Sequence, residues 1–200
     1  DWAEGFRQMW RPGEAGAYSR LKEFLDDRAA GYATARDRPD RLATSHLSPH
    51  LRFGELSPRQ VWYAARFAMA KSPELASDLQ KFLSELGWRE FCRHLLSDHP
   101  DIHRRNLQSS FDAFPWKKDA KALRAWQRGQ TGYPIVDAGM RELWRTGIMH
   151  NRVRMITASF LVKHLLIDWR RGERWFWDTL LDADLGSNAM NWQYVAGTGV

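Results

Sequence analysis

The sequence predicts an all-α fold from three observations. Apolar residues recur at spacings of three and four along most of the chain, as on the buried face of an amphipathic helix. No segment sustains the alternation of a half-buried strand. Helix-start signals and terminal glycines separate the periodic stretches. We therefore expect roughly seven to nine helices, in one helical domain that occupies residues 1–200.

The first helix is predicted over residues 17–37, where Leu21, Phe24 and Tyr32 are among the apolar positions. A proline-containing break follows it. Residues 42–56 lack helical periodicity and are rich in Thr, Ser, Pro and Gly. We expect them to form an ordered loop with about one helical turn.

Two serine–proline signals start the next helices. Ser57 is the expected N-cap and Gln60 completes a capping box, so a helix should run from there to Lys71. Ser72 repeats the signal. Leu and Phe residues at spacings of three and four then predict a long helix over residues 75–98.

The second half of the chain yields four more predicted helices, over residues 119–128, 134–147, 150–167 and 173–182. Gly129 and Gly147 are placed to terminate the first two of these helices. The helix at 150–167 contains the strongest apolar run. Residues 99–118 are predicted to be irregular, and residues 183–200 lack clear signals.

The amino-acid composition limits the classes of function that the protein can have. The chain contains 30 Lys and Arg against 24 Asp and Glu, which gives a net charge of +6 and a pI near 9.7. This charge favours an anionic partner, nucleic acid before membrane. The single cysteine excludes an internal disulfide and a Cys-rich zinc module, and it favours a reducing compartment, the cytoplasm. We expect no signal peptide, and no apolar run approaches the ~20 residues of a membrane span.

Two clusters of chemistry-bearing residues lie in the first half. Glu85 and Arg89 are four residues apart and share a helix face, with Phe82 on a nearby face. The spacing alone favours an ordinary surface ion pair, which contributes only ~0.3–0.5 kcal/mol. The other cluster is Thr44-Ser45-His46-Leu47-Ser48. Its hydroxyls and backbone donors suit a phosphate, although alone it equally fits an ordinary turn.

Two further clusters are predicted to meet. Asn151, Arg154 and Met155 project to one side at the start of the strongest helix. An arginine next to a buried run needs a carboxylate partner. Asp182 and Asp184 supply carboxylates, and we expect Arg154 to pair with Asp182. The two aspartates also suit helix caps or an acid–base pair. A metal is not expected, because no third oxygen ligand lies at calcium-loop spacing.

Together these stretches resemble one family, the photolyase/cryptochrome flavoproteins, in their helical FAD-binding domain. The matching stretches are 44–48, 56–60, 85–91, 131–138, 149–155, 182–185, Asn188 and 192–193. The resemblance covers nearly the whole chain. It implies a monomer with one FAD, active in its reduced form. The family's N-terminal α/β antenna domain, with its antenna pigment, is expected to be absent, and so is the C-terminal end of the helical domain.

The resemblance also implies the residues that hold FAD. They are Tyr32, Thr44, Ser45, His46, Leu47, Ser48, Phe82, Arg89, Arg154, Asp182, Asp184 and Asn188. Arg154 and Asp182 are expected beside the isoalloxazine ring, and Asn188 near its N5 atom. Phe82 stands where the family often has Trp.

Within the family, the sequence is most similar to deoxyribodipyrimidine photolyases. These lyases flip a cyclobutane pyrimidine dimer out of DNA and split it by light-driven electron transfer from reduced FAD. The residues implied for binding UV-damaged DNA are Arg36, Glu85, Trp88, Asn151, Arg152, Met155 and Tyr194. Trp88 is expected to stack on the dimer, and Glu85 to stabilise it once it holds the extra electron. Tyr194 replaces a second pocket Trp found in many of these enzymes.

The implied catalytic residues are Glu85, Asn188, Trp116, Trp169 and Trp192. The three tryptophans match a photoreduction chain that runs outward from the flavin, with Trp116 the most exposed. Aromatic rings of low ionisation energy can relay an electron hole. The chain has eleven tryptophans, and each of them equally suits plain core packing.

Two alternatives stay open. A cryptochrome-type blue-light photoreceptor shares the fold and the flavin without repair. Asn188 counts against it, because plant and animal cryptochromes often carry Asp or Cys at this position. A helical DNA-binding domain without catalysis explains the charge, but not the combination of Asp182, Asp184 and Asn188.

Overall fold

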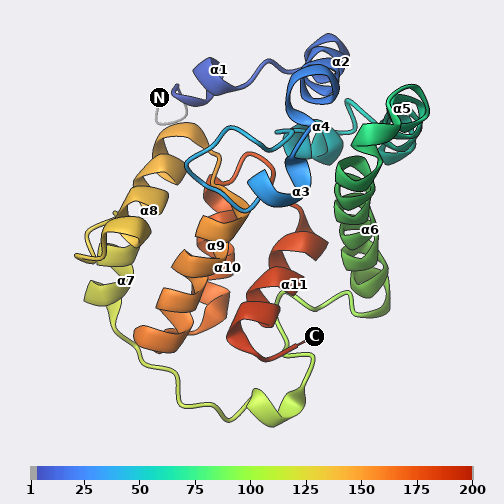
Figure 1. Cartoon of the computed structure of the whole chain (residues 1–200). Coiled ribbons are helices and arrows are strands. Elements are labelled where there is room, and N and C mark those ends of the chain that lie inside the picture. Colours follow the sequence, from blue (N-terminus) through green and yellow to red (C-terminus); the bar gives the residue numbers. More distant parts are fainter. Residues whose placement is uncertain (1–3, 200) are drawn as a thin grey trace. The chain divides into compact units, whose positions relative to one another are not determined.

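The computed structural model describes residues 4–199, and within them the regular elements are all helical (Figure 1). The predicted all-α class is therefore confirmed for the described part of the chain. The chain divides into two compact units, Met9–Phe91 and Cys92–Val200 with Asp1–Gln8. A single domain over residues 1–200 stays a prediction, and its two end residues lie outside the described range. No described helix has the length and apolar character needed to cross a membrane.

The unit Met9–Phe91 holds the aromatic and aliphatic core of the first half. Its elements are α2 (Glu14–Glu23), the π-helical turn η1 (Phe24–Arg28), α3 (Tyr32–Ala35), α4 (Ser48–Phe53), α5 (Pro58–Lys71), the 3₁₀ turn η2 (Pro73–Leu75) and most of α6 (Ala76–Asp98). Phe24, Leu47, Val61, Leu79 and Leu83 are buried at its centre. The apolar periodicity of α5 and α6 thus faces this core, as the sequence predicts.

The prediction of one continuous helix over residues 17–37 is wrong, because the helix is interrupted. Gly31 adopts a left-handed φ of 74°, and α3 begins only after it. Asp78 accepts hydrogen bonds from the backbone N–H groups of Gly31 at 2.9 Å and Ala33 at 2.7 Å. These bonds satisfy donors that a helix start leaves unpaired. A carboxylate from α6 therefore stabilises a break that the local pattern does not reveal.

The predicted start of α5 is confirmed. The Ser57 Oγ accepts from Gln60 N at 3.2 Å, and Gln60 Oε1 accepts from Ser57 N at 2.7 Å. This is the reciprocal capping box. Within residues 42–56, α4 supplies the expected helical turn.

The other unit contains the helices of the second half. Its elements are most of α1 (Phe6–Met9), the end of α6, the 3₁₀ turn η3 (Ser109–Phe111), α7 (Ala120–Gln127), α8 (Pro134–Thr146), α9 (Asn151–Ser159), the π-helical turn η4 (Phe160–His164), α10 (Trp169–Thr179) and α11 (Leu185–Ala196). In its core, Trp126, Met140, Leu143, Leu161 and Trp169 are almost fully buried. Helices α8 and α9 pack together, as do α10 and α11.

The sequence prediction misses or misplaces three features of this unit. Helix α11 is not predicted, because its buried residues lie on more than one face and include polar side chains such as Asn188 and Gln193. Helix α10 begins earlier than residue 173, because Asp168 caps it by accepting from Arg170 N at 2.9 Å. The helix expected over 150–167 widens into the π-helical turn η4 after Ser159.

Candidate functional site

The predicted site residues fall on both units, and each unit's share is described separately. In the unit Cys92–Val200, a cavity of about 80 Å³ brings seven of them together. These are Asn151, Arg154, Met155, Asp182, Asp184, Asn188 and Trp192. A binding site for a large organic ligand needs about 300 Å³ or more. This cavity can therefore supply only part of the surface that contacts such a ligand.

The predicted pairing of Arg154 with Asp182 is confirmed. Arg154 Nη2 donates to Asp182 Oδ2 at 2.9 Å, and its Nε donates to the carbonyl of Met149 at 2.7 Å. The Asp182 side chain is only 8% exposed, and that of Arg154 is 26% exposed. The first turn of α9 and the turn before α11 position the two groups. A guanidinium fixed by two acceptors is thus presented at the cavity wall.

Asn188 is oriented by a residue that the sequence analysis does not identify. Its Nδ2 donates to the carbonyl of Glu173 at 3.0 Å and to Glu173 Oε1 at 2.9 Å. A primary amide has two N–H donors, so both are used and Oδ1 is the atom that can accept from a ligand. Burial raises the pKa of the Glu173 carboxyl, and the hydrogen bond from Asn188 partly offsets this.

Asp184 confirms the capping alternative. Its Oδ1 accepts from Ser187 N at 3.0 Å at the start of α11, and its Oδ2 accepts from Arg93 Nη2 at 3.3 Å. Its role toward a cofactor stays a prediction. Trp192 lines the same cavity, and its buried Nε1 has no hydrogen-bond partner within the described part of the chain. A buried donor of this kind is a place where a ligand atom or a water is expected.

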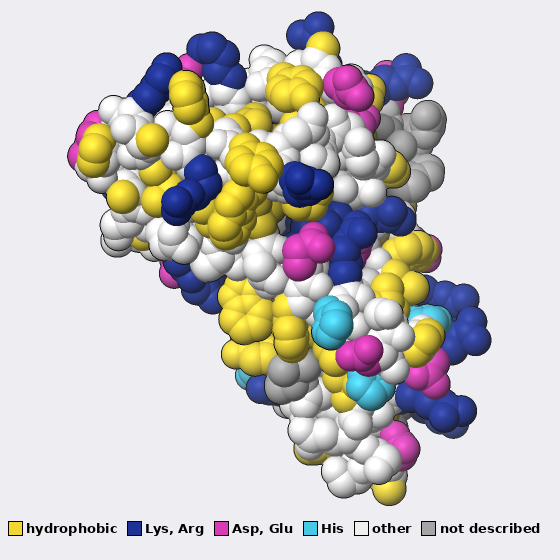
Figure 2. All heavy atoms as spheres, turned by 90° about the vertical axis from the view of Figure 1, so that its right-hand side faces the viewer, with side chains coloured by type: hydrophobic (Ala, Val, Ile, Leu, Met, Phe, Trp, Pro, Cys, Tyr) yellow, Lys and Arg dark blue, Asp and Glu magenta, His cyan; other side chains and the backbone are white. Residues whose placement is uncertain are grey.

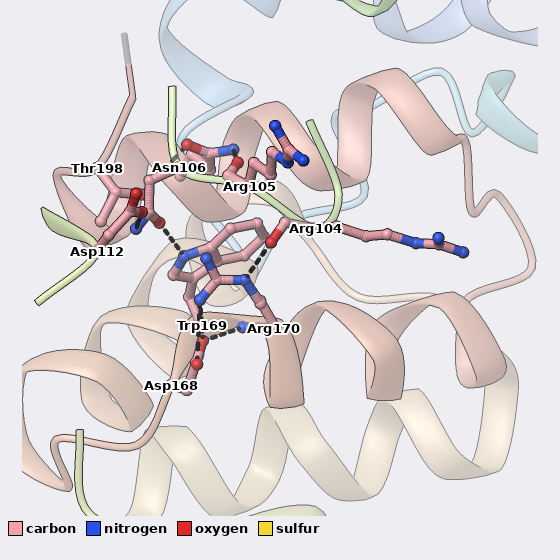
Figure 3. Close-up of polar contacts among 9 residues, drawn as sticks. Arg104, Arg105, Asn106, Asp112, Asp168, Trp169, Arg170 and Thr198 are labelled. Carbon is pink, nitrogen blue, oxygen red and sulfur yellow. Dashed lines mark hydrogen bonds and ion pairs between the residues drawn. The ribbon is translucent and has the colours of Figure 1, made fainter. Parts of the chain in front are cut away.

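The three tryptophans of the predicted relay belong to one core cluster. Trp169 is 0% exposed and Trp192 is 2% exposed, whereas Trp116 is half-buried at the edge of the cluster. This order of exposure matches the prediction for Trp116. Trp169 Nε1 donates to Asn106 Oδ1 at 2.9 Å, and Asn106 Nδ2 donates to Asp112 Oδ1 at 2.7 Å (Figure 3). The relay itself stays a prediction.

The remaining predicted residues of this unit lie near the start of α9 and on α11. His150 caps α9, because its Nδ1 accepts from Arg152 N at 3.2 Å. Arg152 Nη1 lies 3.5 Å from Met155 Sδ. Met155 and the exposed Tyr194 line a wider groove of about 660 Å³. Asn151 is exposed.

The stretch 131–138, part of the resemblance, has a structural role here. Asp137 accepts from the Thr131 backbone N at 2.7 Å, from the Thr131 hydroxyl at 2.6 Å and from Gly132 N at 2.9 Å. Burial favours the neutral acid, but these hydrogen bonds outweigh it and lower the pKa of Asp137. The carboxylate fixes the turn that leads into α8.

In the unit Met9–Phe91, Glu85 binds two cations. Arg36 Nη1 lies 2.6 Å and Lys81 Nζ 3.4 Å from the same atom, Glu85 Oε1. Arg89, which the spacing pairs with Glu85, donates to the carbonyl of Leu51 at 3.0 Å and lies 3.4 Å from the Glu90 carboxylate. Sequence spacing does not identify the Arg36 partner, because a distant part of the chain supplies it.

Trp88 presents a ring to solvent. It is 54% exposed and meets Phe91 edge to face, with 5.7 Å between ring centroids. An exposed indole held by a second aromatic ring is suited to stacking on a flat ligand.

Tyr32 and Phe82 form a buried aromatic cluster with Phe24. Their centroids lie 4.6–5.7 Å apart. Burial raises the pKa of Tyr32 to about 12, although the charge of Arg36 opposes this. Phe82 is therefore part of the core of its unit, and its packing on a cofactor stays a prediction.

The loop before α4 is an irregular segment that carries hydroxyl groups. His46 has a left-handed φ of 53°, which non-glycine residues seldom adopt. Leu47 N donates to Ser45 Oγ at 3.4 Å, and Arg28 donates to the carbonyl of Thr44 at 3.3 Å. Leu47 is buried and Ser48, the first residue of α4, is exposed. The stretch is thus a bent loop that leads into α4, and phosphate binding stays a prediction. Among the described residues, no group of three His, Cys, Asp or Glu is arranged to hold a metal.

Comparison with known proteins adds to this geometry. The family described as the FAD binding domain of DNA photolyase matches residues 82–200. A deoxyribodipyrimidine photo-lyase of Agrobacterium fabrum is 58% identical over 200 residues, which are 100% of this chain and 41% of that protein. Cryptochrome-1 of Arabidopsis thaliana is 44% identical over 196 residues, which are 96% of this chain and 29% of that protein.

Among solved structures, the crystal structure of a bacterial class III photolyase from Agrobacterium tumefaciens is similar, with a TM-score of 0.96 and 56% identity. It covers 100% of this chain and 41% of that one. The chain thus spans about two fifths of the length of these two photolyases.

Proposed function

The chain belongs to the DNA photolyase and cryptochrome family through the FAD-binding domain, and from this we propose that the protein splits cyclobutane pyrimidine dimers in DNA in the light, as a deoxyribodipyrimidine photo-lyase. The observation that carries the proposal is the cavity at which Arg154, Asp182 and Asn188 meet. Identity is also higher to the Agrobacterium photolyase, at 58%, than to the Arabidopsis cryptochrome, at 44%.

The groups at the cavity fit a flat cofactor with hydrogen-bonding edges. The Trp192 Nε1 is a buried donor in need of an acceptor, and the Asn188 amide is turned so that its oxygen can accept. Arg154 adds a cation beside them. FAD, when bound and reduced, supplies the electron that light transfers to the dimer. The residues of this chain hold it in place and exclude water from its ring.

The residues proposed for the damaged DNA have matching chemistry. The exposed ring of Trp88 stacks on the dimer, and Asn151 hydrogen-bonds to it. Glu85, fixed by Arg36, shares a proton of its carboxyl group with the dimer carbonyls as they gain negative charge. Arg36 and Arg152 contact backbone phosphates. The net charge of +6 supports an anionic partner.

The finer points are proposals as well. We propose one reduced FAD per chain, an antenna pigment outside these 200 residues, a monomeric protein and a cytoplasmic location. The single cysteine, which is buried and takes part in no disulfide, supports a reducing compartment.

The test is repair of an oligonucleotide with one cyclobutane thymine dimer by the FAD-loaded protein. We expect repair under blue light and none in the dark. A bound flavin without repair would favour the cryptochrome-type photoreceptor. DNA binding without any flavin absorbance would favour a helical DNA-binding domain.

A further inference from the structure

One face of α6 presents three groups whose chemistry complements the parts of a nucleotide: a cation, a carboxyl group and an aromatic ring. Lys81, Glu85 and Trp88 are separated by four and three residues, so they lie on one side of the helix. The Lys81 side chain is 42% exposed and that of Glu85 is 31% exposed, and Trp88 is 54% exposed. A cation, a carboxyl group and an open aromatic ring therefore follow one another along about 10 Å of helix.

The surroundings of this face combine aromatic and cationic groups, because Phe91 meets Trp88 edge to face and Arg36 contacts Glu85. Figure 2 views the molecule from the side on which α5 and α6 lie in Figure 1, and hydrophobic side chains are interspersed with Lys and Arg on that side as well. Aromatic rings next to basic side chains are the features by which proteins bind single strands of nucleic acid.

Two cations share one oxygen of Glu85, and they differ in how firmly they are held. Arg36 lies 2.6 Å from Oε1, its side chain is 11% exposed, and its guanidinium lies 5.8 Å from the Tyr32 ring centroid. Lys81 lies 3.4 Å from the same oxygen and is more exposed. Arg36 is the nearer and the more buried of the two cations, so Lys81 is the cation that solvent and a ligand can reach more easily.

We propose that Lys81 binds a backbone phosphate of the DNA strand whose pyrimidines stack on Trp88. The proposal rests on the proposed function and extends its DNA site by one residue. The contact with Glu85 is easily exchanged, because ion pairs between residues four apart on an exposed helix face are weak. A phosphate contact gains from the release of the counterions condensed on DNA. The long, flexible lysine stem allows the ammonium to move from the carboxylate to the phosphate.

The experiment compares two lysine variants of the FAD-loaded protein, Lys81→Met and Lys22→Met. Lys22 is a matched control, because it lies in the same unit and pairs at 2.6 Å with Asp26, also four residues away. The dissociation constant for a dimer-containing oligonucleotide is measured over a series of salt concentrations. A third variant, Lys81→Arg, keeps the charge.

In Lys81→Met, the slope of log K against log salt should become shallower by about 0.7–0.9, which is the contribution of one phosphate contact. Lys22→Met should keep the wild-type slope, and Lys81→Arg should keep nearly all of it. Flavin content and the thermal midpoint show that each variant is folded.

An unchanged slope in folded Lys81→Met would overturn the role of Lys81. An equal loss in Lys22→Met would do the same, because the effect would then reflect net charge alone. In both cases the wild type still binds and repairs dimers, so the proposed function survives. If the wild type itself shows no preference for dimer-containing DNA, both proposals fail.

Discussion

The amide of Asn188 donates both of its hydrogen bonds to Glu173, to the carboxyl Oε1 at 2.9 Å and to the main-chain carbonyl at 3.0 Å. Helices α10 and α11 therefore fix a polar side chain that neither helix places alone. The orientation leaves Asn188 Oδ1 as the acceptor at the cavity. An amide held in this way keeps its geometry without help from a ligand, which is the arrangement that a binding site needs.

Glu173→Gln should change how stability depends on pH. Burial raises the folded-state pKa of Glu173 above its ordinary value of 4.5. The stabilisation that accompanies its proton is complete below pH 4.5 and is lost as pH rises through the raised pKa. Gln keeps the acceptor but does not titrate. The unfolding free energy of the variant, relative to wild type, should therefore rise from pH 4.5 toward neutral pH.

Urea denaturation at several pH values measures this difference. The exposed Glu14→Gln is the control. A difference between Glu173→Gln and wild type that stays constant over this pH range would mean that the carboxyl is not perturbed by burial.

Arg154→Leu should lower the free energy of unfolding by about 3 kcal/mol, because it leaves the buried Asp182 carboxylate without its guanidinium. The figure is the low end of the range for buried pairs, since the Arg154 side chain is 26% exposed. The double variant Arg154→Leu with Asp182→Leu should recover part of the loss. Denaturant titration gives both values, and a loss as small as that of a surface pair would contradict the buried assignment.

The sequence analysis identifies features that produce either an apolar pattern on one helix face or a short local motif. Helix α5 has an apolar face and a capping box, so its position follows from pattern alone. The Arg154–Asp182 pair follows from the requirement that an arginine beside a buried run be neutralised. Helix α11 has no one-sided apolar pattern, because polar and apolar residues are buried around most of its circumference.

The sequence analysis also misses two partners of site residues, Glu173 for Asn188 and Arg36 for Glu85, and it misses them for another reason. Glu173 is a charged residue within an amphipathic helix and resembles a solvated position, although only 8% of it is exposed. The contact between Arg36 and Glu85 joins two distant segments. Periodicity carries no information about such a contact. A tertiary structure is needed to find both.

Trp116→Phe should slow photoreduction of the bound flavin and leave repair by pre-reduced protein almost unchanged. Phe is harder to oxidise than Trp, and Trp116 is the most exposed of the three rings of the proposed relay. Steady illumination with an external reductant measures the first activity, and dimer repair measures the second. The half-exposed Trp62→Phe is the control. Equal loss of both activities in Trp116→Phe would refute the relay.

Glu85→Ala should lower the quantum yield of dimer splitting more than it weakens binding. In the proposed role, the carboxyl group of Glu85 shares a proton with the dimer carbonyls, and this hydrogen bond is strongest once the dimer holds an extra electron, so its loss affects the chemical step. The variant also leaves Arg36 and Lys81 without their shared carboxylate, and the added positive charge should keep affinity for undamaged DNA at or above that of wild type.

Asp26→Ala is the matched control for Glu85→Ala, because it removes an exposed carboxylate that also binds a lysine four residues away. It should leave the quantum yield unchanged. If Glu85→Ala retains the wild-type yield and binds dimers more weakly, Glu85 is an anchor for substrate and takes no part in the chemistry.

The central claim is that the protein transfers an electron to a dimer and that the electron returns to the protein after the dimer is split. The most direct measurement is the number of dimers repaired per flavin, under blue light and without oxygen, after a single initial reduction and removal of the reductant. The account predicts many repaired dimers for each reduced flavin, with the reduced absorbance spectrum retained throughout. At most one repaired dimer per flavin, with the flavin left oxidised, would contradict it.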